Sequence, residues 1–503
     1  MQDNKIQKVV VVGGGTAGWM SAALLCRIAG KGLDIELVES EQIGTVGVGE
    51  ATIPQIRYLC DALKIPEAEF LSEVNGTYKL GIEFVDWGKI GDRYIHTFGD
   101  VGRRLGVLDF HQAWLRARQL GIGDDLGEYS FNAIAAYANK FAHVEKLGDT
   151  GLLGLGYAFH FDATLVAKLL RELSEANGVK RTEGKICDVN LHPETGFVES
   201  LTLENGDQVS GDIFIDCSGF RSLLLGEALG VKYVDWSHWL PADSAIAVQC
   251  ESVEPLTPYT RSTAHSSGWQ WRIPLQNRIG NGHVYSSPYM GDDEAQDILM
   301  SNLDAEAVTE PRQLRFTTGK REKFWYKNCI GLGLASGFME PLESTSIHLV
   351  QAGLGRLIDL FPTKDFTQVD VDEYNKRTDF EFESIRDFLI LHYKATERDD
   401  SDFWNYCRTM EIPDSLQYKI DLWSAHGRFY RNEDELFTTP SWIQVFIGQH
   451  IVPNDCHGLA KVLTEADATD YLERIQGYLT EAVDKMPTHR EFVSKHCQMK
   501  DAG

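Results

Sequence analysis

A carboxylate and a potential anion site lie side by side in the segment SGFMEPLESTSIHLV, residues 336–350. A proline interrupts the chain there, and an apolar pattern with helical spacing follows within a few residues. Ser344 is a residue type that favours the N-cap, so we expect a helix that begins with free amides at Thr345 and Ser346. Such a helix end attracts anions. The negative side chain of Glu343 beside it therefore needs a chemical explanation.

A second motif with chemical meaning lies near the start of the chain. Gly13, Gly15 and Gly18 match the pattern G-x-G-x-x-G, and Glu39 follows 21 residues after the last of them. These glycines let the backbone approach a pyrophosphate at a helix N-terminus, and the acid accepts a ribose hydroxyl. We interpret this as a dinucleotide site. The alternative is a glycine turn with a structural role only.

The later glycine turns distinguish between two kinds of dinucleotide. A glycine loop at 41–54 stands where a nicotinamide-binding domain would continue with a helix, and further turns follow at 215–222 and 331–341. Three turns that converge on one ligand favour FAD bound in an extended form, although the late turns are alternatively ordinary sheet connections. Only one fingerprint occurs, so we expect a separate partner to supply reduced flavin.

The elements that must position these residues follow from the local patterns. Residues 8–30 read as strand, turn and helix, and residues 33–40 as the returning strand. Asp162 is the expected N-cap of a helix that ends at Gly178. Antiparallel strands are expected around the turns at 193–197 and 204–207, before buried strands within 212–219 and 328–337. From about residue 366 the pattern is mostly helical.

Composition limits the class of protein. The chain has 503 residues, a net charge of −26 and nine scattered cysteines without a C-x-x-C pair. Such acidity disfavours nucleic acid and anionic membranes as partners, and no apolar run is long enough to span a bilayer. The cysteine pattern fits a reducing cytosol and gives no structural metal site. We expect a soluble, cytoplasmic enzyme; the sequence leaves open whether it forms a homodimer.

Six motifs together resemble the flavin-dependent tryptophan halogenase family over almost the whole chain. They are GGGTAGW, VGVGEATIP, GTYKLGIEFVDW, GWQWRIP, FIDCSGFRS and FMEPLESTS. The most specific is W-x-W-x-I-P, formed by Trp269, Trp271, Ile273 and Pro274, in which a period of two puts both indoles on one face of a strand. Taken alone, that pair reads as core aromatics in a hairpin.

The resemblance implies an activity and a set of residue roles. Reduced FAD, O2 and a halide give a hypohalous acid, which passes through a tunnel to an aromatic substrate. Lys79 matches the catalytic lysine, Glu343 the substrate-side glutamate, and the amides of Thr345 and Ser346 the halide site. The implied flavin contacts are Gly13, Gly15, Thr16, Ala17, Gly18, Glu39, Glu50, Ala51, Val189, Leu334 and Val350. The chemistry then explains the neighbouring acid and anion site, because an arene that gains a halogen must lose a proton to a base.

The resemblance also implies a mixed α/β (α+β) fold built on a Rossmann-like FAD-binding domain of the glutathione-reductase and hydroxylase type. We assign residues 1–85, 150–232 and 316–365 to this discontinuous domain. Residues 86–149 and 233–315 form substrate-side insertions that contain a sheet. Residues 366–503 form a mostly helical region that completes the substrate pocket.

The substrate side matches the family only in part. His96 and Phe98 occupy the family's aromatic positions. Trp442 or Phe446 is the candidate to complete the sandwich, and the alternative for each is a place in the core. No clamp for the charged groups of free tryptophan is recognisable at 440–450, so an indole is the predicted substrate. Ser346 replaces a glycine that tryptophan-specific members carry. We expect bromide to be favoured over chloride.

Two alternatives share the FAD fold. One is a flavin-dependent hydroxylase or monooxygenase, and the other is a non-catalytic flavoprotein that binds an aromatic ligand. The fold alone does not separate the three.

Overall fold

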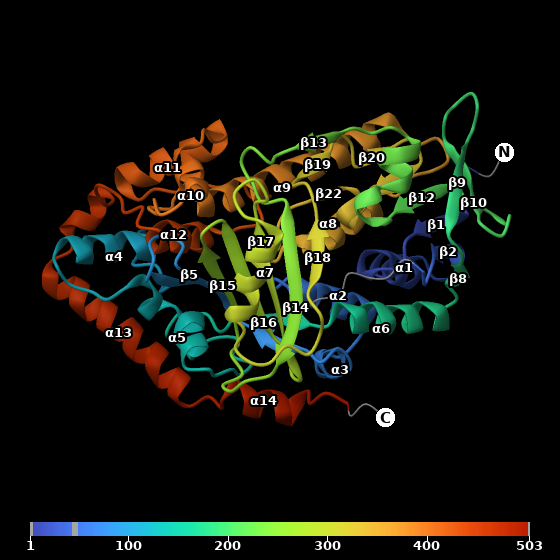
Figure 1. Cartoon of the computed structure of the whole chain (residues 1–503). Helices are drawn as coiled ribbons and strands as arrows, with labels where there is room; N and C mark the ends of the chain where they lie inside the picture. The colour runs from blue at the N-terminus through green and yellow to red at the C-terminus, as the bar shows by residue number, and fades with distance from the viewer. Residues whose placement is uncertain (1–3, 43–48, 501–503) are drawn as a thin grey trace.

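The structure is a computed structural model that describes residues 4–42 and 49–500. Residues 43–48, which belong to the predicted glycine loop and to the motif VGVGEATIP, lie outside this part. The molecule is elongated in the view of Figure 1, with the N-terminal strands at one end and helices of the C-terminal region at the other.

A six-stranded sheet forms the core of the first end. Its central strand is fully apolar after its first residue and is buried from Val9 onward, as expected for a strand covered on both faces. All neighbouring strands pair in parallel except β20 and β21, which pair antiparallel. The spatial order is β20 (Trp325–Tyr326), β21 (Cys329–Gly331), β12 (Ile213–Asp216), β1 (Lys8–Val12), β2 (Asp34–Glu39) and β8 (Lys180–Glu183).

Three helices pack near this sheet (Figure 1). They are α1 (Thr16–Ala29), α6 (Ala163–Ala176) and α8 (Ser346–Asp359). The predicted N-cap of α6 is confirmed, because the Asp162 carboxylate accepts the amides of Thr164 and Leu165. The predicted antiparallel strands are confirmed as β9 (Ile186–Leu191), β10 (Val198–Leu203) and β11 (Gln208–Ser210), which project beside the N-terminus.

A seven-stranded sheet forms the middle of the molecule. It is antiparallel except where β15 and β5 pair in parallel. Its order is β18 (Arg312–Arg315), β14 (Ser244–Glu251), β17 (Arg278–Tyr285), β16 (Gly268–Pro274), β15 (Thr260–His265), β5 (Gly81–Val85) and β6 (Arg93–Thr97). The predicted boundary at residue 85 therefore needs correction: β5 was assigned to the FAD-binding segments but pairs within the sheet of the insertions.

Two small sheets connect the larger ones. The first joins β3 (Glu50–Ala51), β7 (Ala158–Phe161) and β4 (Thr77–Lys79), and the second joins β13 (Tyr233–Asp235), β19 (Gly319–Arg321) and β22 (Gly337–Phe338). The shorter helices of the first 310 residues are α2 (Ile56–Leu63), α3 (Glu67–Glu73), α4 (Phe110–Gln119), α5 (Phe131–Tyr137) and α7 (Asp292–Ser301).

The predicted helical character after residue 366 is confirmed. The longest helix of the described residues, α9, spans 27 residues and lies along the molecule, and most of its apolar residues are buried in the continuous core. The helices are α9 (Gln368–Lys394), α10 (Asp402–Thr409), α11 (Asp414–His426), α12 (Thr439–Gly448), α13 (Glu465–Asp484) and α14 (His489–His496).

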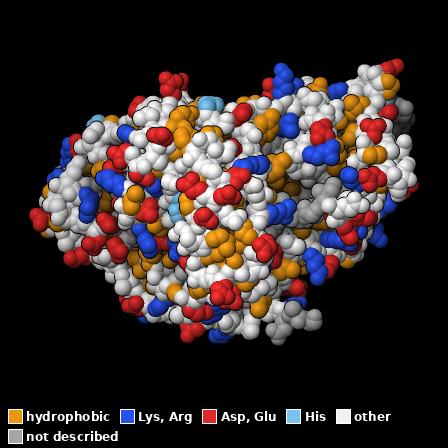
Figure 2. All heavy atoms as spheres, in the orientation of Figure 1, with side chains coloured by type: hydrophobic (Ala, Val, Ile, Leu, Met, Phe, Trp, Pro, Cys, Tyr) orange, Lys and Arg blue, Asp and Glu red, His pale blue; other side chains and the backbone are white. Residues whose placement is uncertain are grey.

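The surface carries both signs of charge. Figure 2 shows Asp and Glu side chains interspersed with Lys and Arg over the face in view. All nine cysteines have free thiols. Across residues 4–42 and 49–500, no helix combines the length and apolar character that a bilayer span needs, and no group of His, Cys, Asp and Glu is arranged to hold a metal ion.

Candidate active site

The glycine fingerprint closes one end of a large cavity. A Cβ atom on Gly13 would lie 2.3 Å from the carbonyl oxygen of Cys217, and one on Gly18 would lie 1.8 Å from the carbonyl oxygen of Gly13. Gly13 also has a φ of 111°, which favours glycine. Gly15, in contrast, has nothing within 4 Å of its Cβ direction, so the backbone is open to a ligand there. The N-terminus of α1 is not capped by a side chain.

The cavity has a volume of about 740 Å³ and runs from these glycines to the first turn of α8. Of the predicted flavin contacts, Gly18 packs against the turn instead, and Val189 lies in β9 outside the lining. Ile186, the first residue of β9, and Lys185 before it line the cavity. The lining contains the other nine: Gly13, Gly15, Thr16, Ala17, Glu39, Glu50, Ala51, Leu334 and Val350.

Four cationic side chains that sequence analysis missed also line the cavity: Lys168, Arg171, Lys185 and Arg221. They suit the negative charge of a pyrophosphate. These four residues form no motif in the sequence, so only their positive charge could have marked them as candidates for a pyrophosphate site. Glu39 ends β2 as predicted, and its carboxylate accepts a hydrogen bond from Arg181 Nε at 2.5 Å. An open glycine turn, an uncapped helix end and cationic walls fit an extended dinucleotide.

Lys79 is fully buried, at the end of β4. Its Nζ donates hydrogen bonds to the carbonyl oxygen of Thr52 at 3.0 Å and to Ser344 Oγ at 2.8 Å, and it lies 5.4 Å from the ring centre of Phe98. Burial lowers the pKa of Lys79 to about 7, although the charge of Glu343 acts in the opposite direction. Ser344 also lines the large cavity, so it connects the lysine to the predicted flavin site.

The start of α8 differs from the prediction in one detail. Ser344 is not the N-cap; Thr345 holds that position, and Ser344 has a left-handed φ of 59° that turns its hydroxyl to Lys79. The amides of Thr345 and Ser346 make no hydrogen bond within the described residues, and Ser346 lines the cavity. These features fit an anion site. Ser346 is not among the described residues with positive φ, so a serine can stand in place of the family's glycine without backbone strain.

Glu343 lies between two histidines. Its carboxylate is 2.9 Å from His96 Nδ1 and 2.9 Å from His392 Nε2, and all three side chains are buried. Burial alone would raise the pKa of Glu343, but the charges and hydrogen bonds of His96 and His392 lower it to about 2. Sequence analysis missed His392, which stands in the middle of a long helix with no motif around it.

Aromatic rings surround this group. His96 and Phe98 follow each other with a period of two at the end of β6, and Phe388 packs edge-on against His96 with ring centres 5.5 Å apart. Phe388 stacks on Phe437 at 3.9 Å, and Trp442 contacts Phe388 at 4.8 Å. Trp442, predicted with Phe446 as the alternative, therefore reaches this cluster.

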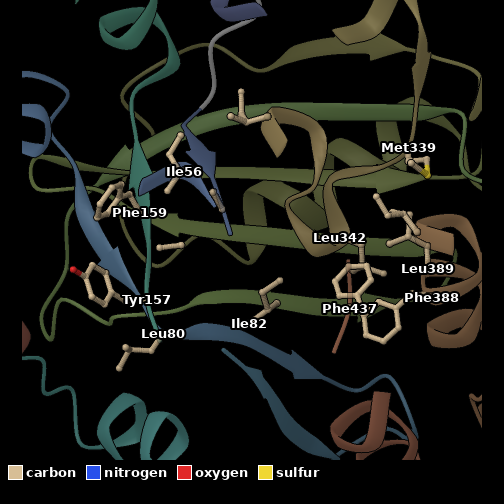
Figure 3. Close-up of a cluster of buried hydrophobic side chains, with 14 of the residues drawn as sticks. Ile56, Leu80, Ile82, Tyr157, Phe159, Met339, Leu342, Phe388, Leu389 and Phe437 are labelled. Carbon is tan, nitrogen blue, oxygen red and sulfur yellow. The ribbon is translucent and has the colours of Figure 1, made fainter. Parts of the chain in front are cut away.

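Glu343 stands between two residues of the chain, Leu342 and Ser344, that both line the large cavity. Leu342 is drawn in the same buried hydrophobic cluster as Phe388 and Phe437 in Figure 3. Lys79 and Glu343 thus belong to the segments between a dinucleotide-sized cavity and an aromatic cluster.

The W-x-W-x-I-P motif gains a structural role. Trp269, Trp271 and Ile273 line the cavity from β16, and the two indole rings lie 6.2 Å apart. Trp269 Nε1 donates to the Glu340 carboxylate at 2.7 Å. The Pro274 carbonyl accepts the hydroxyl of Thr77, two residues before Lys79. The motif therefore supports both the loop that carries Glu343 and the strand that carries Lys79.

The comparisons with known proteins agree with this geometry. A family model described as Tryptophan halogenase matches residues 8–465. Tryptophan 6-halogenase SttH from Streptomyces toxytricini is 36% identical over 84% of this chain and 85% of its own. The structure of Xcc4156, a flavin-dependent halogenase from Xanthomonas campestris, matches with a TM-score of 0.96 at 46% identity, over 99% of this chain and 100% of that one. BrvH, a flavin-dependent halogenase from Brevundimonas sp. BAL3, matches with a TM-score of 0.95 at 43% identity, over 98% and 99%.

Proposed function

Because this chain belongs to the tryptophan halogenase family and is a flavin-dependent halogenase, we propose that it halogenates an indole-type arene by way of Lys79, and that it uses bromide in preference to chloride. Family membership decides against the hydroxylase and the non-catalytic binder considered above. The observation that carries the proposal is the position of Lys79 and Glu343 between the large cavity and the aromatic cluster.

The large cavity is the proposed site of FAD, with a halide at the open amides of α8. When reduced FAD is bound, it supplies with O2 and halide the oxidised halogen, as a hypohalous acid. A separate NAD(P)H-dependent flavin reductase supplies the reduced cofactor, since the chain carries one dinucleotide fingerprint. Glu50 lines this site, and burial raises its pKa to about 7, which reduces its negative charge beside the flavin and the halide.

Lys79 holds the hypohalous acid in this proposal. Two fixed acceptors, the Thr52 carbonyl and the Ser344 hydroxyl, orient its Nζ. With a pKa of about 7, the group exists near neutral pH both as an ammonium and as a free amine. The ammonium would hydrogen-bond the acid and make its halogen more electrophilic, whereas the amine would form a haloamine. Both routes deliver the halogen to the aromatic cluster.

The substrate side favours a ring without charged substituents. The cluster of Phe388, Phe437 and Trp442 is hydrocarbon, apart from the indole nitrogen. The charged groups that touch it are already paired: Glu343 with the two histidines, and Lys419 with Glu435 at 2.7 Å beside Trp442. A free amino acid would bring two charges without partners, at a cost of several kcal/mol at worst. A bare indole, or an indole on a larger molecule, fits better.

The test is a reconstituted reaction. The protein is incubated with FAD, a flavin reductase, NADH, indole and bromide, and the products are analysed by mass spectrometry. A bromine isotope pattern on the indole supports the proposal. A product that has gained oxygen only, or unchanged indole, would contradict it.

A further inference from the structure

Two histidines contact the Glu343 carboxylate from different sides. His392 Nδ1 lies 2.8 Å from the backbone carbonyl oxygen of Phe388, and a carbonyl oxygen only accepts, so Nδ1 donates to it. His392 Nε2 lies 2.9 Å from a Glu343 oxygen, a contact without hydrogen-bond geometry. His392 therefore occupies one side of the carboxylate.

His96 faces Glu343 with the other ring nitrogen, Nδ1. Its Nδ1 lies 3.0 and 2.9 Å from the two Glu343 oxygens, so Nδ1 donates to the carboxylate. Its Nε2 is buried and has no hydrogen-bond partner, and the whole side chain is only 3% exposed. A lone pair on Nε2 is thus available on a ring that contacts Phe388 and Phe437. A buried acceptor without a partner is unfavourable, which points to a proton supplied by a ligand.

We propose that His96 is the base of this site: its Nε2 takes the proton that the arene loses, while Glu343 holds the imidazole in the Nδ1–H form. Carboxylate, imidazole and an open Nε2 form the same relay by which an acid orients a histidine base in other enzymes. Both carboxylate oxygens of Glu343 lie against histidine nitrogens, so neither oxygen is open to take the proton itself. His392 is then a positioning residue, which contacts Glu343 from the other side at 2.9 Å.

In the route through the acid, the bond between halogen and oxygen breaks with both electrons left on oxygen, which takes a proton from the Lys79 ammonium and leaves as water. Lys79 then regains a proton from water. The halogen bonds to a ring carbon through the π electrons of the arene, which gives a cation. The C–H bond at that carbon then breaks, its electron pair restores the aromatic ring, and the proton passes to His96 Nε2. Release of this proton to water returns the base.

This inference rests on the proposed function, but part of its test does not. In protein labelled with ¹⁵N-histidine and free of substrate, the nitrogen resonances report which ring atoms carry protons. We expect His96 protonated at Nδ1 only, with assignments from His96→Gln and His392→Gln. A proton on His96 Nε2 would overturn the inference even if indole is not halogenated.

The second part follows the proton during turnover. Single-turnover rates are compared for indole and for ring-deuterated indole. Wild type is expected to show no isotope effect, because proton loss is fast. His96→Phe keeps an aromatic ring but removes the base, so the rate should fall about 10²-fold or more, with a primary isotope effect.

Two variants separate the alternatives. His348→Gln is a matched control, since His348 forms a similar partly buried pair with Glu381 at 2.8 Å away from the aromatic cluster, and it should show no isotope effect. If Glu343 were the base, the isotope effect would appear in Glu343→Gln and be absent from His96→Phe, which would refute the assignment. His96→Gln is a second substitution at the same position. Flavin binding is measured in each variant, so that a loss of the fold is detected.

Discussion

Trp269 Nε1 donates a hydrogen bond of 2.7 Å to Glu340, and this bond joins the central sheet to the loop that carries Glu343. Tyr393 donates a second bond to the same oxygen at 2.5 Å, while the other Glu340 oxygen is buried without a partner. Burial raises the pKa of Glu340 to about 7 despite these bonds. One buried carboxyl thus fixes strand, loop and long helix together.

Trp269→Phe removes this bond and leaves Glu340 with one donor. We expect a loss of about 1–3 kcal/mol in the free energy of unfolding, measured by urea denaturation, and slower halogenation. Trp271→Phe is the matched control, because Trp271 Nε1 has no acceptor to lose. Equal destabilisation in both variants would show that ring packing, and not the bond, is responsible.

Lys79→Met should abolish halogenation without loss of FAD binding. The side chain reaches the cavity only through Ser344, so the flavin site stays intact. Product is measured by mass spectrometry, FAD affinity by fluorescence titration, and oxygen consumption in the presence of the reductase. A variant that no longer binds FAD would show that Lys79 belongs to the cofactor site.

The same substitution should change how stability depends on pH. The pKa of Lys79 is about 7 in the folded protein and 10.5 in its ordinary range, so between these values the unfolded chain binds more protons. Stability of the wild type therefore rises with pH relative to Lys79→Met, by at most about 1.4 kcal/mol per pH unit. Because Glu50 and Glu340 titrate in both proteins, their contribution to the pH dependence of stability cancels in the difference. A constant difference between pH 7 and 10 would mean that the lysine is not desolvated.

Indole should have a higher kcat/KM than tryptophan. The charged groups near the aromatic cluster have partners, so the ammonium and carboxylate of the amino acid would remain unpaired. Steady-state kinetics with both substrates give the ratio, and tryptamine and indole-3-propionate show which charge is rejected. A preference for tryptophan would be evidence for a clamp formed by other residues.

Bromide should be incorporated in preference to chloride when both are present at equal concentration. Bromide is less strongly hydrated and easier to oxidise, and both properties act in any site of this kind. Because Ser346 is not among the described residues with positive φ, Ser346→Gly should leave the product ratio unchanged. The isotope patterns of the products decide both points; mostly chlorinated product, or a ratio altered by the glycine, would contradict the respective expectation.

Local patterns predicted much of this molecule, because short-range rules govern them. The strand, turn and helix at Gly13, the cap at Asp162 and the antiparallel β9–β11 strands each depend on residues close together in the chain. The placement of β5 was missed, since a parallel pairing with a strand some 180 residues away leaves no local signal.

The site was predicted to a similar extent. Motifs led to Lys79 and Glu343, but His392 lies on an ordinary helix and acquires its role only when α9 packs against the loop of Glu343. Ser344 was expected to cap α8, which its residue type favours, yet its bond to Lys79 prevails. Tertiary contacts thus determined the residues that sequence reasoning misplaced.

The strand that bears Lys79 is also held from far along the chain. The amide of Tyr78 donates to His489 Nε2 at 3.1 Å, and His489 Nδ1 donates in turn to the Leu256 carbonyl oxygen at 3.0 Å. During synthesis on the ribosome, the bond between Tyr78 and His489 can form only after His489 has emerged, 411 residues later in the chain. The strand that bears Lys79 is therefore fully fixed only when nearly all of these residues have been made.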